Sequence, residues 1–304
     1  MELAVLIIGA GPAGLATAAC LSQHSIPCLI VEREDCSASL WRNRTYDRLK
    51  LHLAKEFCAL PYMPYPPNTP TYVPRAEFVK YLDLYIEHFD IQPRFCIAVE
   101  SAAYDVPGKR WAVVARDTIS GAEIRYAATY LVVATGENGV ERIPAIPGQE
   151  SFPGEAIHSS MYKSGRGYAG QRVLVVGSGN SGMEIAYDLA RHGADTSIVI
   201  RSPVFKGVSK IAGNKVIFEG GKESTFDAIV FATGYKSTLN NWLKDNKHML
   251  NNDGFPKKGY PDHWKGEDGL YFAGFARRGL AGITMDAKNI ASNIASFADT
   301  VCLN

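Results

Sequence analysis

Residues 5–14 read Val-Leu-Ile-Ile-Gly-Ala-Gly-Pro-Ala-Gly, an apolar run that passes directly into a glycine-rich turn. Residues 15–21, which follow, are mostly alanine and leucine and favour a helix. A second apolar run at 28–31 ends in Glu32. A buried strand, a GxGxxG turn, a helix and an acidic residue at the end of the next strand form the fingerprint of a dinucleotide-binding fold.

The same pattern returns in the second half of the chain. Residues 172–176 are an apolar run that leads into the turn 177–182, Gly-Ser-Gly-Asn-Ser-Gly, and then into a helix-forming run at 183–192. The strand predicted at 197–200 ends in Arg201, at the place where the first copy has its glutamate. Two fingerprints in one chain predict two dinucleotide sites.

The residues at the two strand ends predict different cofactors. The Glu32 carboxylate accepts ribose hydroxyl hydrogens, which suits FAD or NAD and repels a 2′-phosphate. The Arg201 guanidinium, helped by the Ser202 hydroxyl, favours the 2′-phosphate of NADPH. One site for each dinucleotide is typical of an enzyme that passes hydride from NADPH to FAD. The predicted contacts at the first turn are Gly9, Gly11, Pro12, Ala13 and Gly14, and those at the second are Gly177, Gly179, Asn180, Ser181 and Gly182.

Composition excludes several other classes of protein. The 304 residues are 46% hydrophobic and 21% charged, which is ordinary for a folded globular chain. The formal net charge of +1 offers no field for nucleic acid or an anionic membrane, and no apolar stretch is long enough for a membrane span. The six cysteines have neither zinc-ligand nor redox spacing, so we predict no metal site and no disulfide reductase, and we expect a cytoplasmic protein.

The order of these elements predicts an α/β fold with two Rossmann-like domains, in which the NADPH domain is inserted into the FAD domain. We place the first part of the FAD domain at 1–168, a shortened NADPH domain at 169–235, and the return to the FAD domain with a C-terminal cap at 236–304. The proline-rich stretch 60–67 predicts an extended loop, and the periodicity of 76–89 predicts an amphipathic helix.

Several blocks of sequence resemble one enzyme family. Residues 152–162 match the FxGxxxHxxxY pattern that identifies flavin-containing monooxygenases. The blocks at 45–53, 134–138, 231–237 and 269–275 resemble the plant YUCCA flavin monooxygenases of auxin biosynthesis. The similarity runs in order through nearly the whole chain.

The resemblance implies an enzyme that uses FAD, NADPH and O2 to convert indole-3-pyruvate to indole-3-acetate, by oxidative decarboxylation through a C4a-peroxyflavin. It implies His52 as a polar residue beside the flavin ring, which we predict to be catalytic, and His158 as a linker residue that seats the cofactors or holds a loop. The remaining FAD contacts that it implies, besides the glycines and Glu32, are Arg33, Leu40 and Trp41, with Val99 and Ala134 near the adenine.

One departure from the family leaves the function open. Family members continue after 201–204 through a long block that is missing here before 215–218. The shortened segment 173–233 is long enough for a βαβ unit and a hairpin. Two alternatives therefore stand beside the indole-3-pyruvate enzyme: a flavin monooxygenase that oxygenates nitrogen or sulfur, and a catalytically impaired isoform that binds FAD only. The oligomeric state is not predicted.

Overall fold

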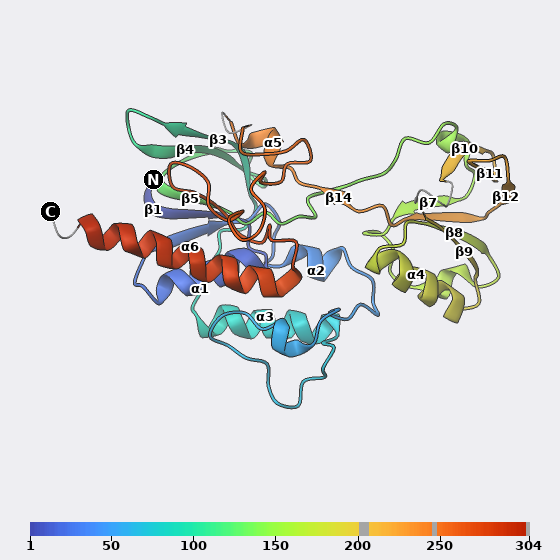
Figure 1. Ribbon diagram of the computed structural model, residues 1–304, viewed down its shortest axis with the longest axis horizontal. Helices are drawn as coiled ribbons and strands as arrows, with labels where there is room; N and C mark the ends of the chain where they lie inside the picture. The colour runs from blue at the N-terminus through green and yellow to red at the C-terminus, as the bar shows by residue number, and fades with distance from the viewer. Residues whose placement is uncertain (201–206, 245–247, 302–304) are drawn as a thin grey trace. The chain divides into compact units, whose positions relative to one another are not determined.

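A computed structural model of the chain describes residues 1–200, 207–244 and 248–301, the last four of these as backbone only. It divides into two compact units, each made of segments that are separate in sequence (Figure 1). Unit 1 comprises Met1–Arg42, Lys50–Val140 and Lys236–Asn304, and unit 2 comprises Asn43–Leu49 and Glu141–Tyr235.

The first long boundary differs from the one that the sequence suggested. Strand β7 (Glu155–His158) pairs in parallel with β13 (Ala228–Phe231) in the sheet of unit 2. Residues 141–168 therefore lie with the second glycine turn and not with the first. The two paired strands are far apart in sequence, so no local pattern indicates that they are neighbours.

Unit 1 is built on a sheet with the strand order β2-β1-β5-β4-β3, and β15 pairs with the last part of β5. Strands β1, β2, β5 and β15 are parallel, whereas β3, β4 and β5 form an antiparallel meander. Ile8 pairs with both Val31 and Val133, so strands β1, β2 and β5 end at the same level. The strands are β1 (Glu2–Ile8), β2 (Cys28–Val31), β3 (Ile97–Asp105), β4 (Arg110–Asp117), β5 (Glu123–Val133) and β15 (Leu270–Phe272).

Both faces of this sheet are covered. Val5 and Ile7 of β1 face one core cluster with α1, α3 and α6, whereas Leu6 and Ile8 face a second cluster with the β3–β4 side and α5. In Figure 1, α1 and α6 lie side by side along the first face. The helices are α1 (Pro12–Ser22), α2 (Ser39–Asn43), α3 (Arg75–His88), α5 (Leu239–Trp242) and α6 (Gly279–Val301), with the 3₁₀ helix η1 at Lys55–Phe57. As predicted, the proline-rich stretch 60–67 contains neither helix nor strand.

Unit 2 repeats the same plan on a smaller scale. Its parallel sheet has the order β7-β13-β8-β9, and β10, β11 and β12 form a separate antiparallel sheet. Val176 pairs with both Phe231 and Val199, which repeats the level strand ends of unit 1. The elements are β8 (Arg172–Val176), α4 (Asn180–Arg191), β9 (Asp195–Val199), β10 (Val208–Ala212), β11 (Lys215–Phe218) and β12 (Glu223–Thr225), with the 3₁₀ helices η2 (Gln149–Ser151) and η3 (Gly165–Tyr168).

The prediction of two Rossmann-like folds, with one inserted in the other, is confirmed. The shortened segment does contain a βαβ unit, β8-α4-β9, followed by an antiparallel hairpin, β10-β11, extended by β12. Strands β6 (Val140–Glu141) and β14 (Tyr235–Lys236) pair where the chain enters and leaves unit 2. Among the described helices, none is both long enough and apolar enough to cross a membrane.

Candidate dinucleotide-binding sites

The first glycine turn is packed so tightly that two of its glycines admit no side chain. Gly9 has φ of +108°, and its N–H donates to the carbonyl of Val31 at 2.8 Å. A Cβ on Gly9 would lie 2.6 Å from the carbonyl oxygen of Ala134, and a Cβ on Gly14 would lie 2.0 Å from that of Gly9. These contacts hold β1, α1 and the end of β5 together, so glycine is required at both positions.

Gly11 has a different reason to be glycine. It is the N-cap of α1, no side chain caps the helix, and Pro12 occupies the first turn. A Cβ on Gly11 would meet no heavy atom within 4 Å, so the position faces open space. The buried Thr135 hydroxyl has no hydrogen-bond partner among the described residues. Free N–H groups, the positive end of the helix dipole and this hydroxyl fit the pyrophosphate of FAD.

Glu32 is fixed beside the turn. Its carboxylate accepts hydrogen bonds from the Ala10 N–H at 2.8 Å and the Glu34 N–H at 3.0 Å. The side chain is half-buried and keeps lone pairs for ribose hydroxyls. Arg33 is exposed, and its guanidinium lies 3.2 Å from the Glu34 carboxylate.

Helix α2 carries two other predicted FAD contacts, Leu40 and Trp41. The N–H of Ala38 donates to the carbonyl of Ala10 at 2.9 Å, which ties the start of this helix to the glycine turn. Both side chains are half-buried. The Trp41 and Phe78 rings pack edge to face, with their centroids 4.6 Å apart. The aromatic packing gives Trp41 a role in the core whether or not it touches the cofactor.

Three predicted residues of the first site remain. Ala134 follows β5, Val99 lies on β3, and His52 lies in a surface bend. Ala134 is buried, and its N–H donates to the carbonyl of Ile8 at 2.9 Å. Strand β3 begins at Ile97, whose N–H donates to the carbonyl of Glu32 at 2.8 Å, and Val99 follows on this strand. His52 is exposed, so its place beside a flavin stays a prediction.

The second glycine turn has the same geometry as the first. Gly177 has φ of +114°, and its N–H donates to the carbonyl of Val199 at 2.9 Å. A Cβ on Gly177 would lie 2.3 Å from the Ala232 carbonyl oxygen, and one on Gly182 would lie 2.1 Å from that of Gly177. Gly179 is the uncapped N-cap of α4, and a Cβ there meets nothing within 4 Å. This turn also fits a pyrophosphate, with Asn180 and Ser181 in the first turn of the helix.

The strand register corrects the match that the sequence suggested between Arg201 and Glu32. Strand β9 ends at Val199, and Val31 and Val199 hold equivalent places in the two sheets. Ile200 and not Arg201 is therefore the counterpart of Glu32, because each directly follows its valine. Unlike the Glu32 carboxylate, an isoleucine at this position does not repel the 2′-phosphate of NADPH. Arg201 and Ser202 themselves lie outside the described residues.

Comparison with known proteins identifies the family of the chain. Residues 6–211 match the family described as pyridine nucleotide-disulphide oxidoreductase. The chain is 43% identical to "Probable indole-3-pyruvate monooxygenase YUCCA10" of Arabidopsis thaliana, with 99% of both chains covered. It is 37% identical to "Indole-3-pyruvate monooxygenase YUCCA6" of the same plant, with 95% of this chain and 89% of that one covered. The chain belongs to the YUCCA family. "Indole-3-pyruvate monooxygenase YUCCA1" of Oryza sativa subsp. japonica is also 37% identical, over 95% of this chain and 90% of that one.

The YUCCA fold also resembles solved structures of two enzyme classes. "Flavin-containing monooxygenase from Stenotrophomonas maltophilia" has a TM-score of 0.83 at 22% identity and covers 98% of this chain and 99% of its own. The bacillithiol disulfide reductase of Bacillus cereus has a TM-score of 0.84 at 21% identity, with 98% and 100% covered. At these identities the likeness concerns the fold. The described cysteines, Cys20, Cys28, Cys36, Cys58 and Cys96, are all free thiols.

The match to YUCCA10 is longer than this chain. The match to YUCCA10 extends over 380 positions, whereas the chain has 304 residues, so at least 76 of those positions are gaps in this chain. The block that the resemblance predicts to be missing after 201–204 would account for a gap of this kind. Strand β10 begins at Val208, soon after β9 ends at Val199.

The FxGxxxHxxxY pattern proves to be a packing motif within unit 2. A Cβ on Gly154 would lie 2.0 Å from the Asp227 carbonyl oxygen, and the buried Tyr162 hydroxyl donates to Asp188 at 2.7 Å. The imidazole of His158 lies 3.1 Å from the Ser160 hydroxyl and 3.1 Å from the Gly234 carbonyl oxygen. The arrangement favours the loop-holding role of His158.

Burial lowers the pKa of His158, although Glu141 and the bond to Gly234 act in the opposite direction. The native protein therefore binds a proton at this ring less readily than the unfolded chain does. We expect the unfolding free energy to fall as the pH is lowered from 7 to 5, because the unfolded chain takes up a proton at this ring before the native protein does. In the His158→Gln variant that part of the pH dependence should vanish in urea titrations. His24→Gln, an exposed control, should keep it, and an unchanged slope in His158→Gln would count against the assignment.

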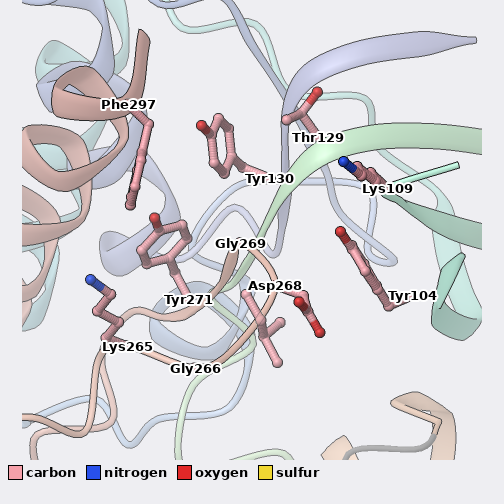
Figure 2. Close-up of a pocket in the computed structure, with 11 residues that line it drawn as sticks. Tyr104, Lys109, Thr129, Tyr130, Lys265, Gly266, Asp268, Gly269, Tyr271 and Phe297 are labelled. Atoms are coloured by element: carbon pink, nitrogen blue, oxygen red, sulfur yellow. The ribbon is translucent and has the colours of Figure 1, made fainter. Parts of the chain in front are cut away.

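A cavity of about 340 Å³ in unit 1 lies apart from the first glycine turn (Figure 2). It opens at the amino end of β15, whereas the first glycine turn follows the carboxyl end of the parallel β1. Aromatic rings of Tyr104, Tyr130 and Tyr271 surround it, together with the Lys109 and Lys265 side chains. None of the predicted site residues that the structure describes lines this cavity.

Two buried hydroxyls near the glycine turns are not among the residues predicted from sequence. Thr135, whose Cα would lie 3.3 Å from a Cβ on Gly9, and Tyr46, in unit 2, each have a buried hydroxyl without a partner among the described residues. Both residues stand in blocks that resemble the YUCCA family, but no local pattern marks them as binding residues. Only tertiary packing shows that their hydroxyls are buried and unsatisfied.

Proposed function

We propose that the protein is an FAD- and NADPH-dependent monooxygenase that converts indole-3-pyruvate to indole-3-acetate. The reaction consumes NADPH, H⁺ and O2 and yields CO2, NADP⁺ and water besides the acid. The observation that carries the proposal is the 43% identity to an indole-3-pyruvate monooxygenase over 99% of both chains. Two glycine turns with matching geometry support it, since the reaction needs one site for each dinucleotide.

The residues of each site have separate tasks. The uncapped start of α1 binds the FAD pyrophosphate, and Glu32, held by Ala10 and Glu34, binds the adenosine ribose. The start of α4 binds the NADPH pyrophosphate, with Arg201 and Ser202 on the 2′-phosphate. FAD, when bound, supplies the chemistry that takes hydride from NADPH and activates O2. His52 is our candidate for a polar group near the reacting ring, and we place the enzyme in the cytoplasm.

The gap relative to YUCCA10 favours a second candidate, a flavoprotein that binds FAD but is not reduced by NADPH. At least 76 positions of the relative's match have no counterpart here. A block missing after 201–204, as the resemblance predicts, would belong to the unit with the second turn. The first turn lies in the other unit and is complete. Loss of hydride delivery with retention of FAD is therefore the specific alternative.

Anaerobic mixing of the FAD-loaded protein with NADPH separates these candidates. We expect the visible flavin absorbance to bleach, and we expect indole-3-acetate and CO2 to form when air and indole-3-pyruvate are then added. Bleaching by dithionite but not by NADPH would favour the FAD-binding alternative. Bleaching by NADPH with oxygenation of amines or thioethers, and no product from indole-3-pyruvate, would assign the enzyme to the nitrogen- or sulfur-oxygenating class.

A further inference from the structure

The segment Asn43–Leu49 lies in unit 2, although the rest of that unit begins only at Glu141. Lys163 holds it at one end, because its ammonium donates to the carbonyls of Asn43 at 2.6 Å and Thr45 at 3.2 Å. The N–H of Asp47 donates back to the carbonyl of Lys163 at 3.0 Å. The backbone on both sides of Tyr46 is therefore fixed.

Arg48 fastens the other end of the segment to α4. Its guanidinium lies 4.5 Å from the centre of the Tyr187 ring and 3.9 Å from the carboxylate of Asp188. Asp188 is itself buried, and it accepts hydrogen bonds from the Tyr162 hydroxyl at 2.7 Å and the Gly165 N–H at 2.8 Å. A buried carboxylate with these partners gives the segment one position against the helix.

Between these two anchors the Tyr46 side chain is only 3% exposed. Its hydroxyl has no hydrogen-bond partner in the part of the chain that the structure describes. Burial raises the pKa of this phenol, Glu184 raises it further, and the nearby Ser181 acts against them. The hydroxyl thus lies beside the first turns of α4, whose N-cap, Gly179, has no side-chain cap. Ser181 and Glu184 of α4 face the hydroxyl but make no hydrogen bond of normal length to it, so a ligand oxygen would satisfy this buried O–H.

We propose that Tyr46 is a dinucleotide-binding residue of the second site, whose hydroxyl donates a hydrogen bond to a pyrophosphate oxygen of NADPH. The inference rests on the proposed function, because it takes NADPH as the ligand at the start of α4. It assigns to Asn43–Leu49 the task of completing a phosphate site whose glycine turn begins at Gly177. In sequence, Tyr46 lies far upstream of that turn.

The test compares Tyr46→Phe with Tyr187→Phe, which removes an exposed hydroxyl on the same helix that Tyr46 faces. Calorimetric titration of the FAD-loaded proteins with NADP⁺ should give about tenfold weaker binding for Tyr46→Phe, equal to ~1.4 kcal/mol, and no change for Tyr187→Phe. The affinity for 2′-AMP, which lacks the pyrophosphate, should be the same in both variants as in the native protein. The hydroxyl is unsatisfied without ligand. In the absence of NADP⁺ the melting temperature of Tyr46→Phe should therefore equal or exceed that of the native protein.

The outcomes separate this inference from the proposed function. If the native protein binds NADP⁺ and Tyr46→Phe binds it equally well, the inference alone fails. Equal weakening of NADP⁺ and 2′-AMP, or a lower melting temperature without ligand, would make Tyr46 a packing residue and would also overturn the inference. If the native protein does not bind NADP⁺ at all, both the inference and the NADPH dependence fall.

Discussion

Gly11→Ala should abolish FAD binding while leaving the folded protein intact, whereas Gly14→Ala should destabilise unit 1 itself. A methyl group on Gly11 meets nothing within 4 Å, so it occupies only the space where the pyrophosphate approaches. One on Gly14 would lie 2.0 Å from the carbonyl oxygen of Gly9, and the backbone must move. We expect at least ~100-fold weaker FAD binding for Gly11→Ala, and a loss of about 3 kcal/mol or more in unfolding free energy for Gly14→Ala.

The second turn supplies the matched control for this pair. Gly179→Ala should weaken NADP⁺ binding but leave FAD content and stability unchanged, and Gly182→Ala, whose Cβ would lie 2.1 Å from the Gly177 carbonyl oxygen, should destabilise unit 2. FAD content after gel filtration, NADP⁺ titration and urea unfolding measure the three quantities. A Gly11→Ala protein that keeps its yellow colour and its FAD affinity would show that the first turn is not the FAD site.

The second large effect is expected at Asp286, which is fully buried in α6. Its carboxylate accepts from the Gly274 N–H at 2.9 Å and lies 2.9 Å from the ring nitrogen Nε2 of His263. Gly274 has φ of +83°, and a Cβ there would lie 2.9 Å from the Cβ of Ala13 in the first turn of α1. Asp286 therefore fixes the backbone that lies against the start of α1, the helix that we propose to bind FAD.

Asp286→Ala should lower the unfolding free energy by about 3–5 kcal/mol, because it leaves the buried His263 and a backbone N–H without their acceptor. FAD retention should fall with it. Asp286→Asn should cost less, since it keeps one acceptor, and burial already raises the pKa of Asp286. Asp262→Ala removes an exposed carboxylate and should stay within about 0.5 kcal/mol of the native protein. Equal urea midpoints for Asp286→Ala and Asp262→Ala would refute the assignment.

The sequence predicts the glycine turns well, because each is a local motif whose spacing reports backbone conformation directly. The predicted strands 28–31 and 172–176 are confirmed as β2 and β8, and the helix predicted at 76–89 is α3 at Arg75–His88. The amphipathic period and the β-branched runs are sufficient for these elements.

What the sequence cannot predict depends on pairing between distant segments. The partnership of β7 with β13 moves 141–168 into unit 2, and the register of β9 against β8 replaces Arg201 by Ile200 as the counterpart of Glu32. The burial of the Tyr46 hydroxyl arises in the same way, since its anchors, Lys163 and Asp188, belong to a distant part of the chain. Local propensity carries no information about such contacts.

The sheet of unit 1 has a consequence for how the enzyme is made. Strand β15 (Leu270–Phe272) pairs with β5, and α6 packs on α1, so the parts of unit 1 nearest the C-terminus complete the core that the N-terminus begins. On the ribosome, every segment of unit 2 emerges before β15 does. Helix α1, which follows the first glycine turn, therefore cannot pack against α6 until most of the chain has been translated. Unit 1 therefore has segments made both before and after unit 2, and its core is completed only after all of unit 2 has been made.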